Sequence, residues 1–460
     1  MRLAKYILAM AALSTCFGAA AQSPHSGYFL ENIPNRHELN PSLTPDFNYA
    51  SFLGLPLGGM MTIGLNSNVG AETFLFSRND ELVTGLHESV SSEEFLGKLK
   101  KNNYLEANLR LNILSFGFKK WGGFNTFNLN VRSTTGFNLP RELFEFAKIG
   151  QEDGAPASYD LSSIGVSTTN YVEFAFGHSR QITDKLRAGA KFKYLAGVAA
   201  ADFSLDRMDV NMSGDRWSIR ESGQLFTTNV VDIMYNQNGE IDDFELDAGR
   251  LGVAGNGIGF DFGASYQLLD NLTLSASLTD IGFITWKGST ATANPDEFVF
   301  DGFHHIGAED NPETGESALD QEMDQLEDDL KALARFKNEE DSRRTQSLTT
   351  TLNIGGEYSV LNRKISFGLL SSTRMTSPKV WTELMASVNF RPASWFHATL
   401  NGSVSNLGQS VGVLLNFCPK GFNFFIGSDY IPLKYSKQGI PVSTAKLNFV
   451  MGLTFTFKHG

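Results

Sequence analysis

Few residues in this chain are placed for chemistry. The run Gly177-His178-Ser179-Arg180 sets a histidine beside a serine, a pair that could act as base and nucleophile. His178, however, has the same parity as Phe174 and Phe176 near the end of a strand, so we expect it at a membrane interface. No convincing nucleophile–base pair stands elsewhere in the sequence, and we therefore expect no enzymatic activity.

Metal and cofactor sites are not expected either. His304-His305 stands near acidic residues, but adjacent histidines on a loop lack the spacing of zinc ligands. Residues 236–245 partly match a calcium-binding loop, yet the first ligand position is Met234, which offers no side-chain oxygen. Because Asn238-Gly239 is a strong hairpin signal, we interpret this stretch as a turn between two strands.

The charged residues of greatest interest lie within strands. Between Leu186 and Ala196, apolar residues alternate with small or charged ones, and such a period of two marks a strand with one polar face. The polar face of this strand and of two others carries charges that suit a water-lined interior. The predicted lumen-facing residues are Glu173, Arg187, Lys191, Lys193 and Asp261.

The same alternation recurs along the chain, in segments 258–266, 272–278, 348–358, 365–371, 380–390, 398–404, 411–417, 422–428 and 447–457. Alternation alone does not say where the apolar face points. A soluble sandwich or barrel turns it inward, whereas a membrane barrel turns it outward to lipid. The sandwich is kept as an alternative.

Three features favour the membrane barrel. Many strands are long enough for a tilted crossing, which takes about 9–11 residues. The polar faces are rich in Gly, Ser, Thr and Asn, as suits a wet lumen. Connections alternate in length, a pattern typical of outer-membrane barrels. The short ones are 119–122, 181–185 and 269–271, and the long ones are 136–163, 199–255 and 287–345.

A sheet in hydrocarbon must close on itself, because every backbone N–H and C=O group needs a partner. We count 13 crossings from about Tyr104 onward and expect one more between residues 48 and 77. The sequence therefore predicts an all-β fold, a transmembrane antiparallel β-barrel of 14 strands, with 12 or 16 as alternatives. Short turns would face the periplasm and long loops the exterior.

The N-terminus has the order of a secretory signal peptide. Arg2 and Lys5 precede an apolar stretch and a small-residue site, which predicts cleavage after residue 21. A lipoprotein signal at Cys16 is the less favoured alternative. Residues 22–47 carry four prolines and lack alternation, so we expect a periplasmic or lumen-plugging segment before the barrel, residues 48–460.

Segment 288–345 is an acidic insertion. Between residues 296 and 344 it holds 16 acidic and five basic residues, while the whole chain has a net charge of −12. This balance argues against nucleic-acid binding. A helical stripe indicates a cap on the barrel mouth, with a docking helix or disorder as alternatives; its residues are Leu319, Met323, Leu326, Leu330 and Leu333. Helices are also expected at 88–102 and 140–149.

Three phrases carry a family resemblance: residues 36–45, the stretch from Leu278 to Trp286, and Pro441-Val442-Ser443-Thr444 with the strand after it. Together they resemble an uncharacterised family of outer-membrane barrels from the Bacteroidota. The Asn40-Pro41-Ser42 phrase is distantly similar to FadL-type hydrophobe channels and to barrels of the type IX secretion system. In FadL-type barrels an N-terminal segment plugs the lumen, so this resemblance makes Asn40 and Pro41 candidate plug residues.

Two functions are expected to compete. The first is a channel or transporter for small hydrophobic molecules, located in the outer membrane. The second is a scaffold that presents the acidic insertion 288–345 to a surface or secretion partner. For either, the expected partners are outer-membrane lipid and the assembly machinery of that membrane, and no cofactor is expected.

Overall fold

The computed structural model describes residues 25–52, 59–78, 81–151, 155–214, 216–228, 230–235, 241–246, 252–293, 297–300, 336–376, 379–431, 435 and 446–457. The predicted signal peptide and the helical stripe of the acidic insertion lie outside these residues. Among the described residues, no helix is long and apolar enough to cross a membrane.

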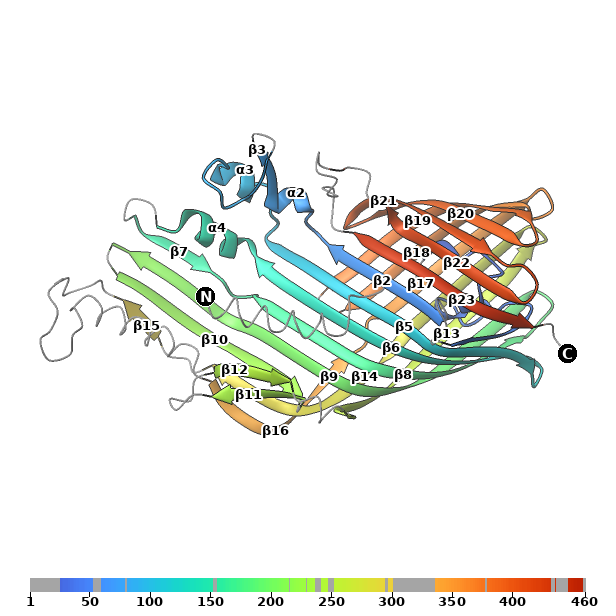
Figure 1. Ribbon diagram of the computed structural model, residues 1–460, viewed down its shortest axis with the longest axis horizontal. Helices are drawn as coiled ribbons and strands as arrows, with labels where there is room; N and C mark the ends of the chain where they lie inside the picture. Colours follow the sequence, from blue (N-terminus) through green and yellow to red (C-terminus); the bar gives the residue numbers. More distant parts are fainter. Residues whose placement is uncertain are drawn as a thin grey trace, which may run out of the picture.

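Antiparallel strands form most of the described chain (Figure 1). The wall strands are β1 (Asn48–Phe52), β2 (Gly59–Ser67), β5 (Asn102–Lys120), β6 (Gly123–Pro140), β8 (Gly165–Gln181), β9 (Leu186–Ser213), β10 (Arg216–Thr228), β13 (Gly255–Leu269), β14 (Leu272–Ala293), β16 (Phe336–Ser347), β17 (Thr350–Val360), β18 (Ile365–Thr376), β19 (Lys379–Ala393), β20 (Phe396–Ser405), β21 (Gly408–Phe417), β22 (Phe422–Ile431) and β23 (Leu447–Phe457).

The strands close into a barrel of 14 positions, which confirms the predicted fold and strand number. β1 and β2 share one position, because both pair with β5 on one side and β23 on the other. β16 and β17 likewise follow one another along β14. The last strand therefore meets the first, and the wall has no free edge.

The barrel is apolar outside and polar inside. On β9, the side chain of Phe192 is 43% exposed, while its neighbour Lys193 is 2% exposed. The same alternation places Phe262 and Leu369 on the outer surface and Asn389 on the inner one. A wall that turns such apolar side chains outward is stable against hydrocarbon rather than water. The alternative of a soluble sandwich is wrong.

Short turns gather at one rim, beside the C-terminal end of the chain, and the longer excursions at the other (Figure 1). Trp121 and Gly122, between β5 and β6, both have positive φ, as a two-residue hairpin turn requires. The predicted loops 199–255 and 287–345 are too long, because β9 and β14 continue well past the positions where we ended them. β13 lies between β9 and β14 over the part of the wall nearer the short turns. Toward the long-loop rim, β10 occupies this position instead.

The long-loop rim carries the smaller elements. These are α2 (Ala71–Phe74), β3 (Leu75–Arg78), β4 (Glu81–Thr84), α3 (Ser92–Leu96), α4 (Arg141–Ile149), β7 (Ala157–Asp160), β11 (Val231–Tyr235), β12 (Ile241–Leu246) and β15 (Glu297–Phe300). The helix predicted at 140–149 is confirmed as α4, whereas 88–102 is helical over α3 alone. β11 and β12 pair as a hairpin, as expected from Asn238-Gly239.

A β-bulge interrupts the wall at Asp280. Along the β13–β14 pair, Asp261 alone stands opposite Thr279 and Asp280, and Asp280 has φ of 58°. Asp tolerates this left-handed conformation better than most residues. The extra residue reverses the parity of β14: even-numbered residues face outward before it, whereas Ile284 and Trp286 beyond it are buried.

Candidate functional site

Residues 25–47, which we call the N-terminal segment, lie inside the barrel. They include two short 3-10 helices, η1 (His25–Gly27) and η2 (Pro34–Glu38), and every residue from 33 to 40 is buried. Their hydrogen bonds reach inward-facing groups on strands around the whole circuit, from β5 to β22. The segment therefore fills much of the lumen that the alternating strands enclose.

The first attachment of the N-terminal segment is at His25 and Ser26. The backbone N–H groups of both residues donate to the Asp429 carboxylate, at 2.8 and 2.9 Å, and the Ser26 hydroxyl donates to it as well. His25 Nδ1 lies 3.1 Å from Glu383 Oε1. Burial alone would lower the pKa of His25, but the hydrogen bond and charge of Glu383 outweigh it and raise that pKa.

The middle of the segment touches the short-turn rim. Arg391 donates to the Phe29 carbonyl at 2.7 Å, and the Phe29 ring lies where a Cβ on Gly368 would stand. Asn32 Nδ2 lies 3.3 Å from Cys418 Sγ. Asn423 donates to the Asn32 carbonyl at 2.7 Å. These contacts join the segment to the wall without making it a strand.

Asn40 and Pro41, the candidate plug residues, pass directly against β9 and β13. A Cβ added to Gly189 would stand 2.4 Å from the Pro41 carbonyl oxygen, and one on Gly263 would stand 2.1 Å from Asn40 Oδ1. Asn40 Nδ2 donates to the Ala276 carbonyl at 3.2 Å, and its Oδ1 accepts from Ser42. The two wall glycines thus create the space through which this turn passes.

The second attachment is at Glu38, which joins a network of buried charges in the wall. Glu38 pairs with Arg110 at 3.2 Å, and Arg110 also approaches Glu173 at 3.5 Å. Lys193 contacts Asp261 at 2.7 Å and Asp280 at 2.6 Å, while Arg132 bridges Glu173 and Asp280 at 2.8 and 2.9 Å. We call the wall residues the charged cluster: Arg110, Arg132, Glu173, Lys193, Asp261 and Asp280.

All five predicted lumen-facing residues point into the barrel, but they do not form one site. Glu173, Lys193 and Asp261 meet in the charged cluster. Lys191 is buried at 4% exposure on the same strand face, and Arg187 donates to Thr44 of the N-terminal segment. His178, by contrast, is exposed and bonds to Asn125 on the neighbouring strand.

Sequence reasoning missed half of the charged cluster. Arg110 and Arg132 stand among Asn108, Asn112 and Asn130, all on the inner parity of their strands, and that signal could have identified them. Asp280 could not be found in this way. Its parity matches that of the outward Leu278, and the bulge re-aims it inward.

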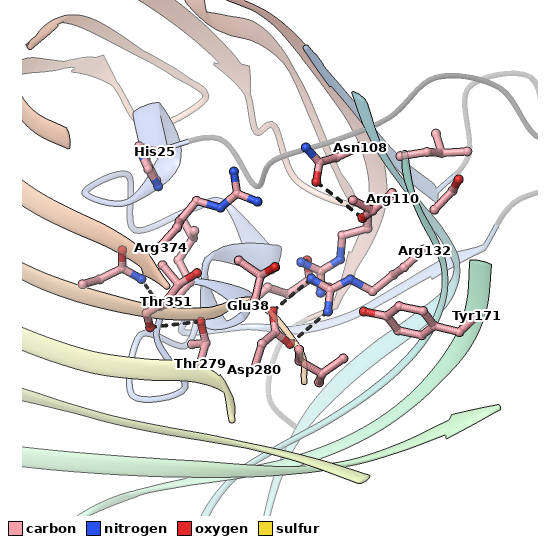
Figure 2. A pocket seen from close by; sticks show the side chains of 17 residues that line it. His25, Glu38, Asn108, Arg110, Arg132, Tyr171, Thr279, Asp280, Thr351 and Arg374 are labelled. Atoms are coloured by element: carbon pink, nitrogen blue, oxygen red, sulfur yellow. Dashed lines mark hydrogen bonds and ion pairs between the residues drawn. The ribbon is translucent and has the colours of Figure 1, made fainter. Parts of the chain in front are cut away.

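Two of the cavities beside the N-terminal segment bear on its function. One, of about 100 Å³, lies between Glu38 and the charged cluster, with the guanidinium of Arg374 on its far side (Figure 2). The other, of about 220 Å³, lies at the short-turn rim. In the part of the chain that the structure describes, no group of three or more His, Cys, Asp or Glu residues could hold a metal.

Comparisons with solved structures return two toluene transporters and a FadL homologue, among others, at low similarity. The toluene transporter TbuX of Ralstonia pickettii is 10% identical, with 96% of this chain and 95% of that chain covered and a TM-score of 0.44. The P. putida toluene transporter TodX is 9% identical, with 96% of each chain covered and a TM-score of 0.41. A Pseudomonas aeruginosa FadL homologue is 10% identical, with 96% and 99% covered and a TM-score of 0.42.

A search of the curated proteins finds no match. The model of a family of unknown function, DUF5723, matches residues 41–429. This range runs from the turn of the N-terminal segment at Pro41 to the Asp429 that anchors the start of that segment. The chain belongs to this family.

Proposed function

We propose that the protein is an outer-membrane channel whose lumen is closed by its own N-terminal segment. One observation carries this proposal: residues 25–47 occupy the lumen of an apolar-surfaced barrel, and non-covalent polar contacts hold them there. A segment held in this way can leave the lumen without unfolding the wall. Export by a cleaved signal peptide, insertion by the assembly machinery and surrounding outer-membrane lipid belong to the same proposal.

The residues that line the lumen indicate which class of solute could pass through the channel. The charged cluster and the wall asparagines would offer hydrogen bonds to a small polar solute along this route. A hydrophobic molecule on this route would displace water from the buried polar groups without offering them a hydrogen bond. Its passage would therefore be unfavourable. Hydrophobic cargo, a bacteroidotan origin and a link to type IX secretion stay predictions from the sequence resemblance.

A tether tests whether the N-terminal segment closes the channel. Because Asn32 contacts Cys418, the substitution Asn32→Cys places a second thiol within reach of that cysteine. We expect liposomes containing the Asn32→Cys protein to be impermeable when the disulfide is formed. A protein lacking residues 22–47 should admit small solutes at least about tenfold faster.

The control variant is Asn32→Ser, which cannot be cross-linked. Its flux should not respond to oxidant or reductant, whereas reduction of the Asn32→Cys protein should restore wild-type flux. Equal flux in the deleted and the oxidised proteins would exclude the N-terminal segment as the closing element. Heat-modifiable gel mobility would establish in each case that the barrel is folded.

The scaffold hypothesis stays a prediction, since most of the acidic insertion lies outside the described residues. Its test is excision of residues 301–335, which spares β14, β15 and β16 and should leave the barrel folded but abolish capture of a secretion or surface partner. Retention of such partners after excision would refute it.

A further inference from the structure

The cavity of about 220 Å³ at the short-turn rim has a mixed lining. The N-terminal segment supplies the rings of Tyr28 and Phe29, and the wall supplies hydroxyl groups from β13 and β14. Charged residues from both surround these groups. They are Glu31, Arg36, Asp46, Arg187, Glu357 and Arg363.

Arg36 is the unusual member of this lining. Its side chain is 9% exposed, and two of its three guanidinium nitrogens, Nε and Nη1, are buried without a hydrogen-bond partner among the described residues. Burial lowers the pKa of Arg36, although guanidinium stays protonated in proteins. A buried charge that lacks a bonded partner is costly and is normally paired.

Two of the neighbouring acids, Glu31 and Glu357, are already engaged. Arg391 binds Glu357 at 2.7 Å, and Arg363 lies 3.7 Å from Glu31. Arg187 donates to the Thr44 hydroxyl and to Gln181. Arg36 therefore keeps two nitrogens, Nε and Nη1, that have no hydrogen-bond acceptor among the described residues.

We propose that this cavity binds a small monocarboxylate anion, held by the guanidinium of Arg36. A charge-assisted hydrogen bond from this guanidinium to a carboxylate oxygen would compensate the buried charge. The hydroxyl groups of Ser265 and Thr273 can donate to the same ligand, and the Tyr28 and Phe29 rings suit a short apolar body. The nearby carboxylates of Glu31, Asp46 and Glu357 disfavour a dianion such as phosphate by like-charge repulsion.

This inference goes beyond channel function and does not depend on it. The site is formed between the N-terminal segment and the wall, so an anion bound there would stabilise the docked segment whether or not a solute passes through the barrel. Binding to the full-length protein in detergent therefore tests the site alone, and liposome flux tests the channel.

The experiment titrates the detergent-solubilised protein with acetate, benzoate and inorganic phosphate by calorimetry. We expect wild type to bind the two carboxylates, with benzoate tighter, and phosphate at least tenfold more weakly. Arg36→Gln should abolish carboxylate binding, and Arg36→Lys should weaken it. Arg180→Gln, which changes an exposed arginine on the same rim that does not line the cavity, should bind within about twofold of wild type.

Absence of carboxylate binding by wild type, or unchanged binding by Arg36→Gln, would overturn the proposal. Tighter binding of phosphate than of the carboxylates would overturn the assignment of the ligand class. The thermal midpoint without ligand gives a second readout. Arg36→Gln should match or exceed wild type, because it removes an unpaired buried charge, and a lower midpoint would instead assign Arg36 a structural role.

Discussion

The two attachments of the N-terminal segment use different chemistry. At His25 and Ser26, three donors of the segment converge on the Asp429 carboxylate, which accepts one further hydrogen bond, from Asn448 on the neighbouring strand β23. At Glu38, one carboxylate joins the charged cluster, whose other bonds link β5, β6, β8, β9, β13 and β14 to one another. The first attachment holds the segment in the lumen, while the second is also part of the wall.

Because of this difference, we expect one set of substitutions to affect docking of the N-terminal segment and another to affect the stability of the barrel wall. Breaking a buried ion pair by removing one partner costs about 3–5 kcal/mol, because the other charge is left uncompensated. Hydrogen bonds to a charged group contribute about 1.5–3 kcal/mol each. We therefore expect variants at the charged cluster to weaken the barrel, and variants at Asp429 to release the segment from an intact barrel.

The largest effect is expected for Glu173→Gln. Glu173 is fully buried and compensates Arg132, with Arg110 and Lys193 nearby, so its neutralisation leaves excess positive charge inside the wall. We expect the free energy of unfolding in detergent to fall by about 3–5 kcal/mol, measured by urea titration.

Glu93→Gln is the matched control, because Glu93 is exposed on α3 at the long-loop rim. It should change the free energy of unfolding by less than about 0.5 kcal/mol. If Glu173→Gln were equally mild, the charged cluster would not stabilise the wall, and the contrast between the two attachments would disappear.

An intermediate effect is expected for Asp429→Asn. The neutral side chain keeps one acceptor oxygen but loses the charge that binds the N–H groups of His25 and Ser26. A loss of about 1.5–3 kcal/mol corresponds to a roughly 10- to 100-fold shift toward the released segment. Liposome flux should rise, while the urea midpoint of the barrel stays close to that of wild type.

Asp270→Asn, at the exposed short turn between β13 and β14, is the control for this substitution. It should alter neither flux nor stability. A large fall in the urea midpoint of Asp429→Asn without added flux would mean that this attachment, too, belongs to the wall.

The sequence predicted the wall of this barrel well, because its strands follow a simple physical rule. Along each strand, apolar side chains such as Phe192 alternate with polar ones such as Lys193. They alternate because one face of the wall is the apolar outer surface and the other face lines the polar interior. The number of 14 strands followed from counting such crossings. A short turn breaks the alternation, so it marks where one strand ends and the next begins.

The contacts within the lumen could not be predicted in the same way. Alternation gives the face of a side chain but not its partner across the barrel, so the pairing of Glu38 with Arg110 was not foreseen. A single-residue bulge defeats the parity rule outright, because Asp280 has the parity of the outward Leu278 and yet faces inward. Arg36 lies in a segment without alternation, where sequence pattern carries no information on burial.

The smallest effect is expected for His25→Gln, and it depends on pH. The folded-state pKa of His25 is raised by Glu383 above its ordinary value of 6.5. The resulting stabilisation is fully present below pH 6.5 and is lost as pH rises through the raised pKa. Wild type should thus exceed His25→Gln in thermal stability by no more than about 1 kcal/mol at acidic pH, and less at pH 9.

His37 makes this comparison between two proteins necessary. Burial holds the pKa of His37 well below 6.5, so acid weakens docking through His37 while it strengthens docking through His25. The pH profile of wild type alone would mix both contributions, whereas the difference between wild type and His25→Gln isolates the first attachment. A difference that grows toward alkaline pH would show that His25 is bound to Glu383 as the neutral imidazole, and the attachment would then owe its strength to Asp429.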